Sequence, residues 1–374
     1  MANFDYAATK PEIADEVIEK IISVLKTNNG NPSAVYKIGR TAKELLENAR
    51  KNVSDVLGCK PEEIIFTSGG SEADNMAIKG VVFASLAEKK HIITTKMEHK
   101  AVLETCKFLE VHGLAEVTYL EPGVTQYITP CQLEEAIRDD TILISIMSVN
   151  NEIGTTNPIH RLSEVAHKHG ILFHTDAVQF SRVGVPRVWE LGVDLMSISG
   201  HKFGAPKGVG VLYIKDGVAI EPLIHGGGQE FGLRAGTENL AYIVALGEAI
   251  KTLPKYDFEK QFTQSMHLRT MLRDAFKDDI KFVSENSDIS GILNFAIKDI
   301  PALELQAFLD MNNIYMSIGS ACSSGDPKAS HVLEAFKIPE SEIHNYMRVS
   351  ISAETTDDEI DEFVALLKFY VSMK

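Results

Sequence analysis

Short apolar runs alternate with helical patterns through the first two thirds of this chain, and this alternation restricts the fold more than any other feature. The runs are rich in β-branched residues, and several are continuously apolar, which is typical of strands covered on both faces. They lie at 64–68, 91–96, 116–120, 141–149, 171–175, 195–199 and 208–214. Helical patterns separate most of them, at 72–88, 100–111, 132–138 and 161–169. Such alternation requires right-handed crossovers, so it predicts an α/β fold with a mainly parallel seven-stranded sheet.

The chain is long enough for a second unit. The last two runs are too close together for a crossover helix, so one of those strands should run antiparallel. From about Tyr256 a new pattern begins, with a long helix at 258–276 and further strands near 291–297, 314–318 and 347–351. Because 374 residues exceed one simple core, we expect a large domain at 15–255. A smaller α+β domain should combine 1–14 with 256–374.

Charge and cysteine usage exclude several classes of protein. The net charge of -15 argues against direct binding of nucleic acid, although a local basic pocket for a phosphate remains compatible with it. The longest apolar stretch, 142–149, is far shorter than the ~20 residues that span a bilayer, so we expect no contact with a membrane. The N-terminus resembles no signal peptide, and no CxxC pair occurs among four cysteines. These features predict a cytoplasmic protein.

Ligands in open parallel sheets bind at the carboxyl ends of the strands, so the residues after each run are the candidates for a site. Gly70 and Ser71 follow the run 64–68 at the start of a helix, where free N–H groups and a hydroxyl can hold a phosphate. An ordinary N-capped helix has the same pattern. His99 and Asn151 also follow strands, but a single histidine is usually structural and an amide often caps a turn.

Asp176 and Lys202 indicate which kind of cofactor the site would bind. Asp176 ends a very apolar strand, so its carboxylate needs a cation or a protonated nitrogen, for which a neighbouring arginine is the ordinary candidate. Lys202 lies in a glycine-flanked turn after another strand and is either a nucleophilic amine or a surface lysine. With His99 and the phosphate-type turn, these residues predict a site for pyridoxal 5'-phosphate, which needs a Schiff-base lysine, a carboxylate and an anion cup.

Cys322 is the cysteine most suited to chemistry. It lies among serines and glycines with little to pack against, which favours an accessible thiol. Cys59, Cys106 and Cys131 lie in or beside regular elements, and we interpret them as structural.

The sequence resembles the cysteine desulfurases, of the NifS- and IscS-like kind, in the class V aminotransferase branch of fold-type I pyridoxal phosphate enzymes. The matching segments run in order over nearly the whole chain. They are FDYAAT (4–9), GNPS (30–33), FTSGGSEADN (66–75), EH (98–99), VNNEIG (149–154), HTDAVQ (174–179), SGHKFGAPKGVG (199–210), RAGTEN (234–239), SACSSG (320–325) and MRVSI (347–351). Each segment is weakly diagnostic alone, whereas the combination is highly specific.

The resemblance implies a role for individual residues. Lys202 would form the Schiff base, Asp176 would contact the pyridine nitrogen, Gln179 the ring oxygen, and His99 would stack on the ring and move protons. The phosphate would be held by residues from both subunits of a homodimer, with Thr237 reaching in from the second subunit; its ligands would be Gly70, Ser71, Ser199, His201 and Thr237. Asn151 and Arg348 would bind the carboxylate of L-cysteine.

The implied reaction converts L-cysteine to L-alanine and leaves a persulfide on Cys322. A sulfur-acceptor protein would follow, either an iron–sulfur scaffold or an enzyme of tRNA or cofactor thiolation. Lys10, Tyr36 and Ala353 depart from the family pattern, at the rim of the expected site. Two alternatives stay open: another class V enzyme, such as an aminotransferase or a selenocysteine lyase, and a non-catalytic protein that keeps the fold.

Overall fold

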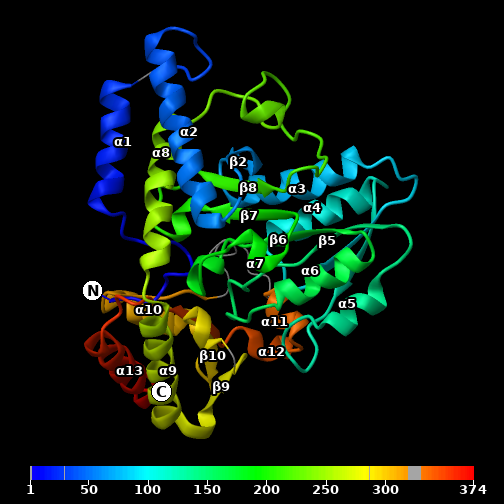
Figure 1. Cartoon of the computed structure of the whole chain (residues 1–374). Helices are drawn as coiled ribbons and strands as arrows, with labels where there is room; N and C mark the ends of the chain where they lie inside the picture. The colour runs from blue at the N-terminus through cyan, green and yellow to red at the C-terminus, as the bar shows by residue number, and fades with distance from the viewer. Residues whose placement is uncertain (1, 29, 286, 319–329) are drawn as a thin grey trace.

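A seven-stranded sheet forms the centre of the molecule (Figure 1). The computed structural model describes residues 2–28, 30–285, 287–318 and 330–374. The strands follow one another in space in the order β2-β8-β7-β6-β5-β3-β4. Their bounds are β2 (Ile64–Thr67), β3 (His91–Thr95), β4 (Glu116–Leu120), β5 (Thr141–Ser145), β6 (Leu172–Asp176), β7 (Leu195–Ser199) and β8 (Gly210–Ile214).

The pairing confirms the mainly parallel sheet and the antiparallel strand predicted among the last two runs. Strands β4, β3, β5, β6 and β7 pair in parallel, and β8 is antiparallel to β7. Strand β8 is also antiparallel to β2, so β2 points the same way as the rest. The carboxyl ends of six strands therefore meet at one edge of the sheet. The predicted run at 141–149 ends as a strand at Ser145, because the chain then bends out of the ladder.

Helices cover both faces of this sheet, as continuous apolar strands require. Neighbouring residues such as Ile92 and Ile93 point to opposite faces and enter two separate apolar cores. One core is closed by α3 (Gly70–Ala84) and α4 (Lys100–Val111). The other is closed by helices from several parts of the chain: α2 (Lys37–Leu57), α5 (Pro130–Ala136), α6 (Ile159–Lys168), α7 (Val188–Leu191) and α8 (Leu240–Ala249).

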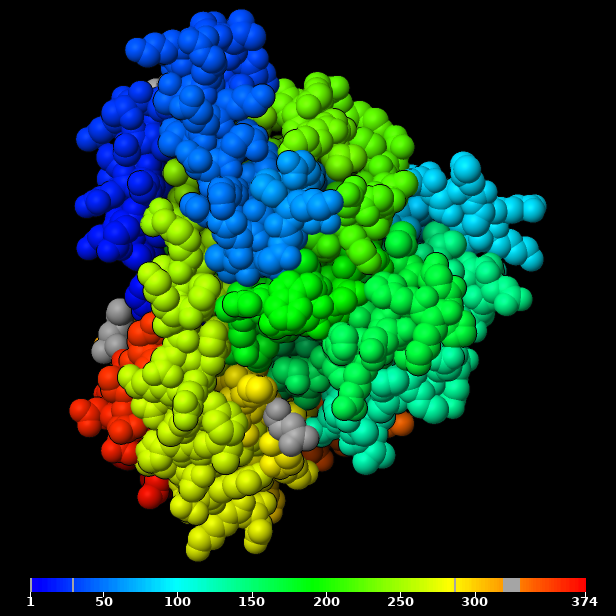
Figure 2. Space-filling model, viewed as in Figure 1, coloured from blue at the N-terminus to red at the C-terminus, as the bar shows by residue number. Residues whose placement is uncertain are grey.

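The N-terminal helices differ from the sequence prediction. Pro11 is typical of the first turn of a helix and predicts one over 11–26, but α1 spans Asp15–Thr27. The preceding segment is held in place because the backbone N–H of Lys10 donates to the carbonyl of His201. Helix α2 was not predicted at all, although it is 21 residues long and packs on α8. Figure 2 shows α1 and α2 as a projecting blue lobe beside the yellow-green residues of α8.

A second, smaller sheet follows in the C-terminal third. Its order is β12-β10-β9, all antiparallel, and it lies against α9 (Phe258–Phe276) and α13 (Asp357–Ser372) in a core of its own. The strands are β9 (Ile280–Phe282), β10 (Ile292–Ile297) and β12 (Tyr346–Ser350), and the other helices are α10 (Ala302–Met311), α11 (His331–Ala335) and α12 (Glu340–Ile343).

The first residues of the chain lie beside this smaller sheet (Figure 1). Strand β1 (Ala2–Asn3) pairs in parallel with β11 (Ile314–Tyr315), and Phe4 stacks on Phe363 of α13 at a ring distance of 4.5 Å. The predicted strand at 314–318 is therefore shorter than expected and pairs with the N-terminus. Within the described residues, no helix is both long and apolar enough to cross a membrane.

Candidate cofactor and substrate site

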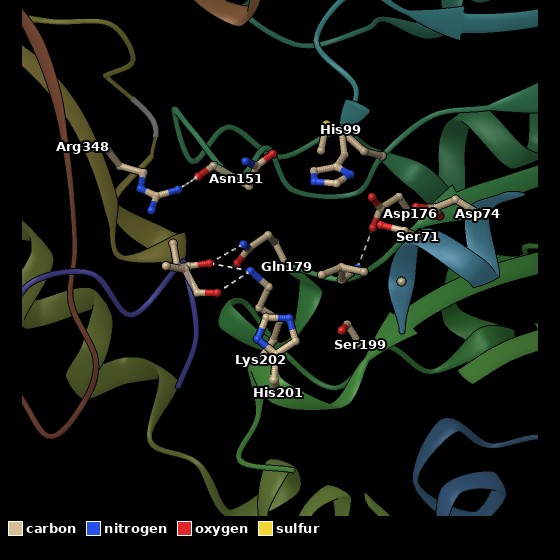
Figure 3. A pocket seen from close by; sticks show the side chains of 15 residues that line it. Ser71, Asp74, His99, Asn151, Asp176, Gln179, Ser199, His201, Lys202 and Arg348 are labelled. Atoms are coloured by element: carbon tan, nitrogen blue, oxygen red, sulfur yellow. Dashed lines mark hydrogen bonds between the residues drawn. The ribbon is translucent and has the colours of Figure 1, made fainter. Parts of the chain in front are cut away.

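A pocket of about 170 Å³ opens where the carboxyl ends of β2, β6 and β7 meet (Figure 3). The fold brings together residues that are up to 341 positions apart in sequence, from Ala7 to Arg348. Most of the predicted site residues line this pocket: Gly70, Ser71, His99, Asn151, Asp176, Gln179, Ser199, His201, Lys202 and Arg348. Sequence reasoning missed Ala7, Ala8, Asp74, Met147 and Val178, which line it as well.

The turn after β2 has the form of an anion cup. Gly69 has φ 153°, a conformation that favours glycine, and α3 begins directly after it at Gly70. A Cβ atom at Gly70 would lie 2.6 Å from Cγ2 of Val178, so a larger residue would close the cup. Ser71 follows at the helix N-terminus, and Ser199 lies opposite, at the end of β7. Free N–H groups and two hydroxyls therefore face a space that suits a phosphate.

Asp176 supplies a buried carboxylate at the end of β6. Its Oδ1 accepts a hydrogen bond from the backbone N–H of Val178 at 2.8 Å. Burial raises the pKa of Asp176, while the nearby His99 and Lys202 act in the opposite direction by favouring its charged form. A protonated ring nitrogen placed against this carboxylate would add a further compensating charge.

Lys202 points into the pocket from the turn after β7. Its Nζ donates to the carbonyls of Ala7 and Ala8 at 2.7 and 3.0 Å. The side chain of Gln179 donates to the same Ala7 carbonyl at 2.9 Å, which leaves the buried Oε1 of Gln179 without a hydrogen-bond partner among the described residues. The FDYAAT segment was recognised as a motif, but nothing in its sequence indicated that its backbone holds the lysine.

His99 is fixed as the N-cap of α4. Its Nδ1 accepts from the backbone N–H of Ala101 at 3.1 Å, which places the ring proton on Nε2. The preceding Glu98 is buried and accepts hydrogen bonds from Thr95 at 2.8 Å and from the backbone of Met147 at 2.9 Å. Burial nevertheless raises the pKa of Glu98 to about 8. Glu98 thereby ties the end of β3 to the end of β5, directly behind His99.

A buried polar cluster lies beneath the pocket floor. Burial lowers the pKa of His174 to about 3, so its ring is neutral, and it contacts Ser145 at 2.8 Å and Ser197 at 3.0 Å. Burial and the neighbouring Asp176 raise the pKa of Asp74, which lies on the inner face of α3. Metal-ligand-type atoms of Asp74, His99 and Asp176 lie within 4.8 Å of one another, and we assign this cluster to the cofactor pocket. The sequence signal for Asp74 was an acidic residue among apolar helix positions.

Arg348 reaches the other side of the pocket from β12. Its Nη1 donates to the carbonyl of Asn151 at 2.9 Å, and its Nη2 lies 2.5 Å from Oδ1 of Asp5. The buried Nε has no hydrogen-bond partner among the described residues. A planar guanidinium held in this way suits two-point binding of a carboxylate.

The comparison with known proteins decides the family. Residues 2–363 match the family Aminotransferase class-V. The chain is 45% identical to a cysteine desulfurase IscS of Dictyoglomus turgidum, over 97% of this chain and 93% of the relative. It is 43% identical to a cysteine desulfurase IscS of Methanosarcina thermophila, over 97% and 90%. The chain belongs to the cysteine desulfurases of this family.

Solved structures of related proteins agree with this assignment. A NifS-like protein superposes with a TM-score of 0.90 at 34% identity and covers all of both chains. The protein SspA, solved in complex with cysteine, superposes with a TM-score of 0.83 at 39% identity and covers 95% of this chain and 100% of its own.

The cofactor of this desulfurase is pyridoxal 5'-phosphate, and the pocket fits it. The glycine cup suits the phosphate, and the buried Asp176 suits a pyridinium nitrogen. The Oε1 of Gln179, which has no hydrogen-bond partner among the described residues, suits a donating ring hydroxyl. Lys202 lines the same pocket and would supply the amine that joins the cofactor aldehyde.

One predicted residue that the structure describes lies outside this pocket. Thr237 is exposed on the loop between β8 and α8 and does not line the pocket of its own chain. Cys322 lies outside the described residues. Among the other cysteines, Cys106 is buried, as expected of a structural thiol, whereas Cys131 is exposed on α5, so it has no packing role there.

The departures from the family pattern lie mostly together. Nζ of Lys10 lies 3.9 Å from the Glu354 carboxylate, in the segment that contains Ala353, and 5.7 Å from the ring centre of Tyr256. Tyr36 is exposed at the start of α2. Lys10 and the segment that contains Ala353 thus face each other, and Glu354 of that segment compensates the charge of Lys10.

Proposed function

We propose that this desulfurase converts L-cysteine to L-alanine and transfers the sulfur atom, as a persulfide on Cys322, to an acceptor protein. The convergence of Lys202, Asp176 and Arg348 on one pocket is the observation that carries this proposal. An amine, a buried carboxylate and a guanidinium in this arrangement suit a cofactor together with an α-amino acid substrate.

Each residue has a distinct task in the proposed reaction. When bound, pyridoxal phosphate supplies the electron sink that makes the Cα proton of the substrate acidic. Arg348 and Asn151 bind the substrate carboxylate and orient the amino acid. Lys202 would hold the cofactor through its amine, and Asp176 would hold the ring nitrogen in its protonated form. His99 moves a proton through Nε2.

The sulfur step balances without an added oxidant. The thiolate of Cys322 attacks the substrate sulfur; the Cβ–S bond of cysteine breaks as an S–S bond forms. Cysteine and one thiol thus become alanine and one persulfide. Because Cys322 is used up in each turnover, an acceptor thiol must remove the outer sulfur before the next one.

We propose three further features of the working enzyme. It acts as a homodimer in which Thr237 contacts the phosphate in the partner subunit. Its acceptor is an iron–sulfur scaffold or an enzyme of tRNA thiolation. It works in the cytoplasm, where a reducing environment protects a catalytic thiol.

The decisive experiment measures alanine release from L-cysteine with and without a thiol reductant, for the wild type and for Cys322→Ser. The wild type should turn over repeatedly only with reductant, whereas Cys322→Ser should release little alanine in either condition. Cys131→Ser is the matched control, because this thiol is exposed on α5, and it should behave as the wild type. Parental alanine release by Cys322→Ser would contradict the persulfide mechanism.

A further inference from the structure

We propose that Glu72 and Arg234 form a charge-compensated pair that sets the affinity of the cup at Gly70 and Ser71 for the cofactor phosphate. The inference rests on the proposed placement of the phosphate in that cup. Both residues are positioning residues, since neither lines the pocket.

Glu72 is built into the turn that forms the cup. It directly follows Ser71, and its Oε2 accepts the backbone N–H of Ser68 at 2.9 Å, which closes the turn from 68 to 72. Its side chain is only 11% exposed. A carboxylate in this position orders the turn, but its negative charge also opposes the binding of an anion.

Arg234 neutralises this carboxylate through two contacts. Its Nε lies 2.8 Å from Oε1 of Glu72, and its Nη2 lies 3.3 Å from Oε2. Burial alone would raise the pKa of Glu72, but the hydrogen bonds from Arg234 and Ser68 outweigh it, so the pKa is lowered and the carboxyl is ionised. The Glu72 carboxylate therefore orders the cup, and Arg234 compensates its negative charge.

A second ion pair fixes the loop that carries Arg234. Arg50 of α2 makes a two-point contact with Glu230 at 2.8 and 2.9 Å, with both side chains 2% exposed, and the backbone N–H of Phe66 donates to the same carboxylate. Glu230 and Phe231 have φ of 44° and 59°, which non-glycine residues rarely adopt. Figure 1 shows this loop, between β8 and α8, passing above β2 and α3.

Segment 230–234 of the loop is thus held by Arg50 at Glu230 and contacts Glu72 through Arg234. Because Arg234 is pre-positioned, little ordering entropy opposes its contact with Glu72. Removing the arginine leaves an ionised, unpaired carboxylate at the edge of the cup. Removing both charges leaves a neutral cup in which a glutamine at position 72 still accepts the N–H of Ser68. The pair should therefore affect phosphate binding through its charges. Loss of the arginine alone should weaken binding, whereas loss of the glutamate alone should not.

The test compares Arg234→Gln, Glu72→Gln and the double variant, each as the full chain stripped of cofactor and titrated with pyridoxal phosphate or with pyridoxal, which lacks the phosphate. The visible band of the lysine-bound cofactor reports binding. Arg234→Gln should weaken pyridoxal phosphate binding about tenfold and leave pyridoxal binding within about twofold. Glu72→Gln should not weaken either, and the double variant should return to within about threefold of the wild type.

Three outcomes would overturn the inference: unchanged binding in Arg234→Gln, an equal loss for both ligands, or a double variant as weak as Arg234→Gln. The thermal midpoint of each variant shows whether a loss comes from misfolding. Arg273→Gln is the matched control, because Arg273 pairs with Glu285 far from the pocket, and it should bind both ligands as the wild type does. A wild type that forms no visible band with pyridoxal phosphate would contradict the proposed function itself.

Discussion

The burial of a single carboxyl group, that of Glu98, makes the stability of the fold depend on pH. Its pKa is raised from 4.5 to about 8 by burial, so between these values it is protonated in the folded chain and ionised in the unfolded chain. The folded state then holds the extra proton, and stability falls as the pH rises through this range.

We predict that Glu98→Gln removes this dependence, because glutamine cannot ionise and still accepts the N–H of Met147. The free energy of unfolding of the variant should match the wild type near pH 4.5 and exceed it by about 1 kcal/mol or more at pH 8. Thermal or urea unfolding across this range measures it. Glu44→Gln, at an exposed position of α2, is the control for the substitution itself. A constant difference at all pH values would contradict the prediction.

Arg348 tests the placement of the substrate carboxylate. We predict that Arg348→Lys lowers kcat/KM for L-cysteine by about 10- to 100-fold, mainly through KM, because an ammonium cannot reproduce two-point binding. The visible band of the bound cofactor should persist. Alanine release at varied L-cysteine measures this effect, with the exposed Arg161→Lys as a control. A loss confined to kcat would instead assign Arg348 to a later step.

Single residues were predictable where a strand ends. Asp176 and Lys202 were found because polar residues directly after apolar strands must lie at the carboxyl edge of the sheet. Ala7 and Ala8 could not be found this way, since they act through backbone carbonyls and meet Lys202 across more than 190 residues of chain. Asp74 lies one helical turn inside α3, where spacing alone does not reveal that it faces the site.

At the scale of elements, the alternating strands were predicted well and the short or polar elements poorly. The seven strands of the large sheet match the apolar runs, because all of them except the partly exposed edge strand β4 are largely buried. Helix α2 was missed because small residues, among them Gly39, Ala42 and Ala49, form much of its buried face. They give a weak apolar pattern. Strand β1 is two residues long and exists only because β11 pairs with it.

The close contact of α2 and α8 carries an element-scale prediction. A Cβ atom at Gly247 of α8 would lie 2.7 Å from Cα of Ala49, which is backbone and cannot rotate away. Gly247→Ala should therefore cost about 1 to 3 kcal/mol of stability, although alanine favours helix formation. Gly123→Ala is the matched control, because its Cβ would meet only a side-chain atom at 3.6 Å. Urea unfolding measures both, and equal stabilities would contradict the packing argument.

At the scale of the whole molecule, Thr237 tests the proposed homodimer. It is exposed and outside the pocket of its own chain, so a contact with phosphate requires a second copy. We predict that a heterodimer of one Lys202→Ala subunit and one Thr237→Ala subunit keeps one complete site and about half of the wild-type cofactor band and alanine release.

Each variant homodimer supplies the control, since each should fall well below the heterodimer. Contact within one chain would give the opposite result, because the heterodimer would then contain no complete site. Differently tagged subunits, purified over both tags, make the measurement possible.

The division into domains stays a prediction. We propose a large unit at 15–255 and a small one at 1–14 with 256–374, supported by the separate apolar core that joins Phe4 to residues of α9 and α13. The sequence could suggest two units because the regular alternation of strands and helices is replaced by a new pattern near Tyr256. The assignment of 1–14 to the small unit belongs to the same prediction, although composition alone carries no signal for it.

The insertion of β8 between β2 and β7 has a consequence for synthesis on the ribosome. The chain emerges from its N-terminus, but β2 cannot join the sheet until β8 is available, since Thr67 pairs with Gly210. The anion cup after β2 must therefore wait for more than a hundred later residues, and Asp5 must wait for Arg348. Such distant pairings make folding slow and leave strand edges uncovered in the nascent chain. Cofactor capture by this pocket accordingly has to wait until β8 has been synthesised and paired with β2.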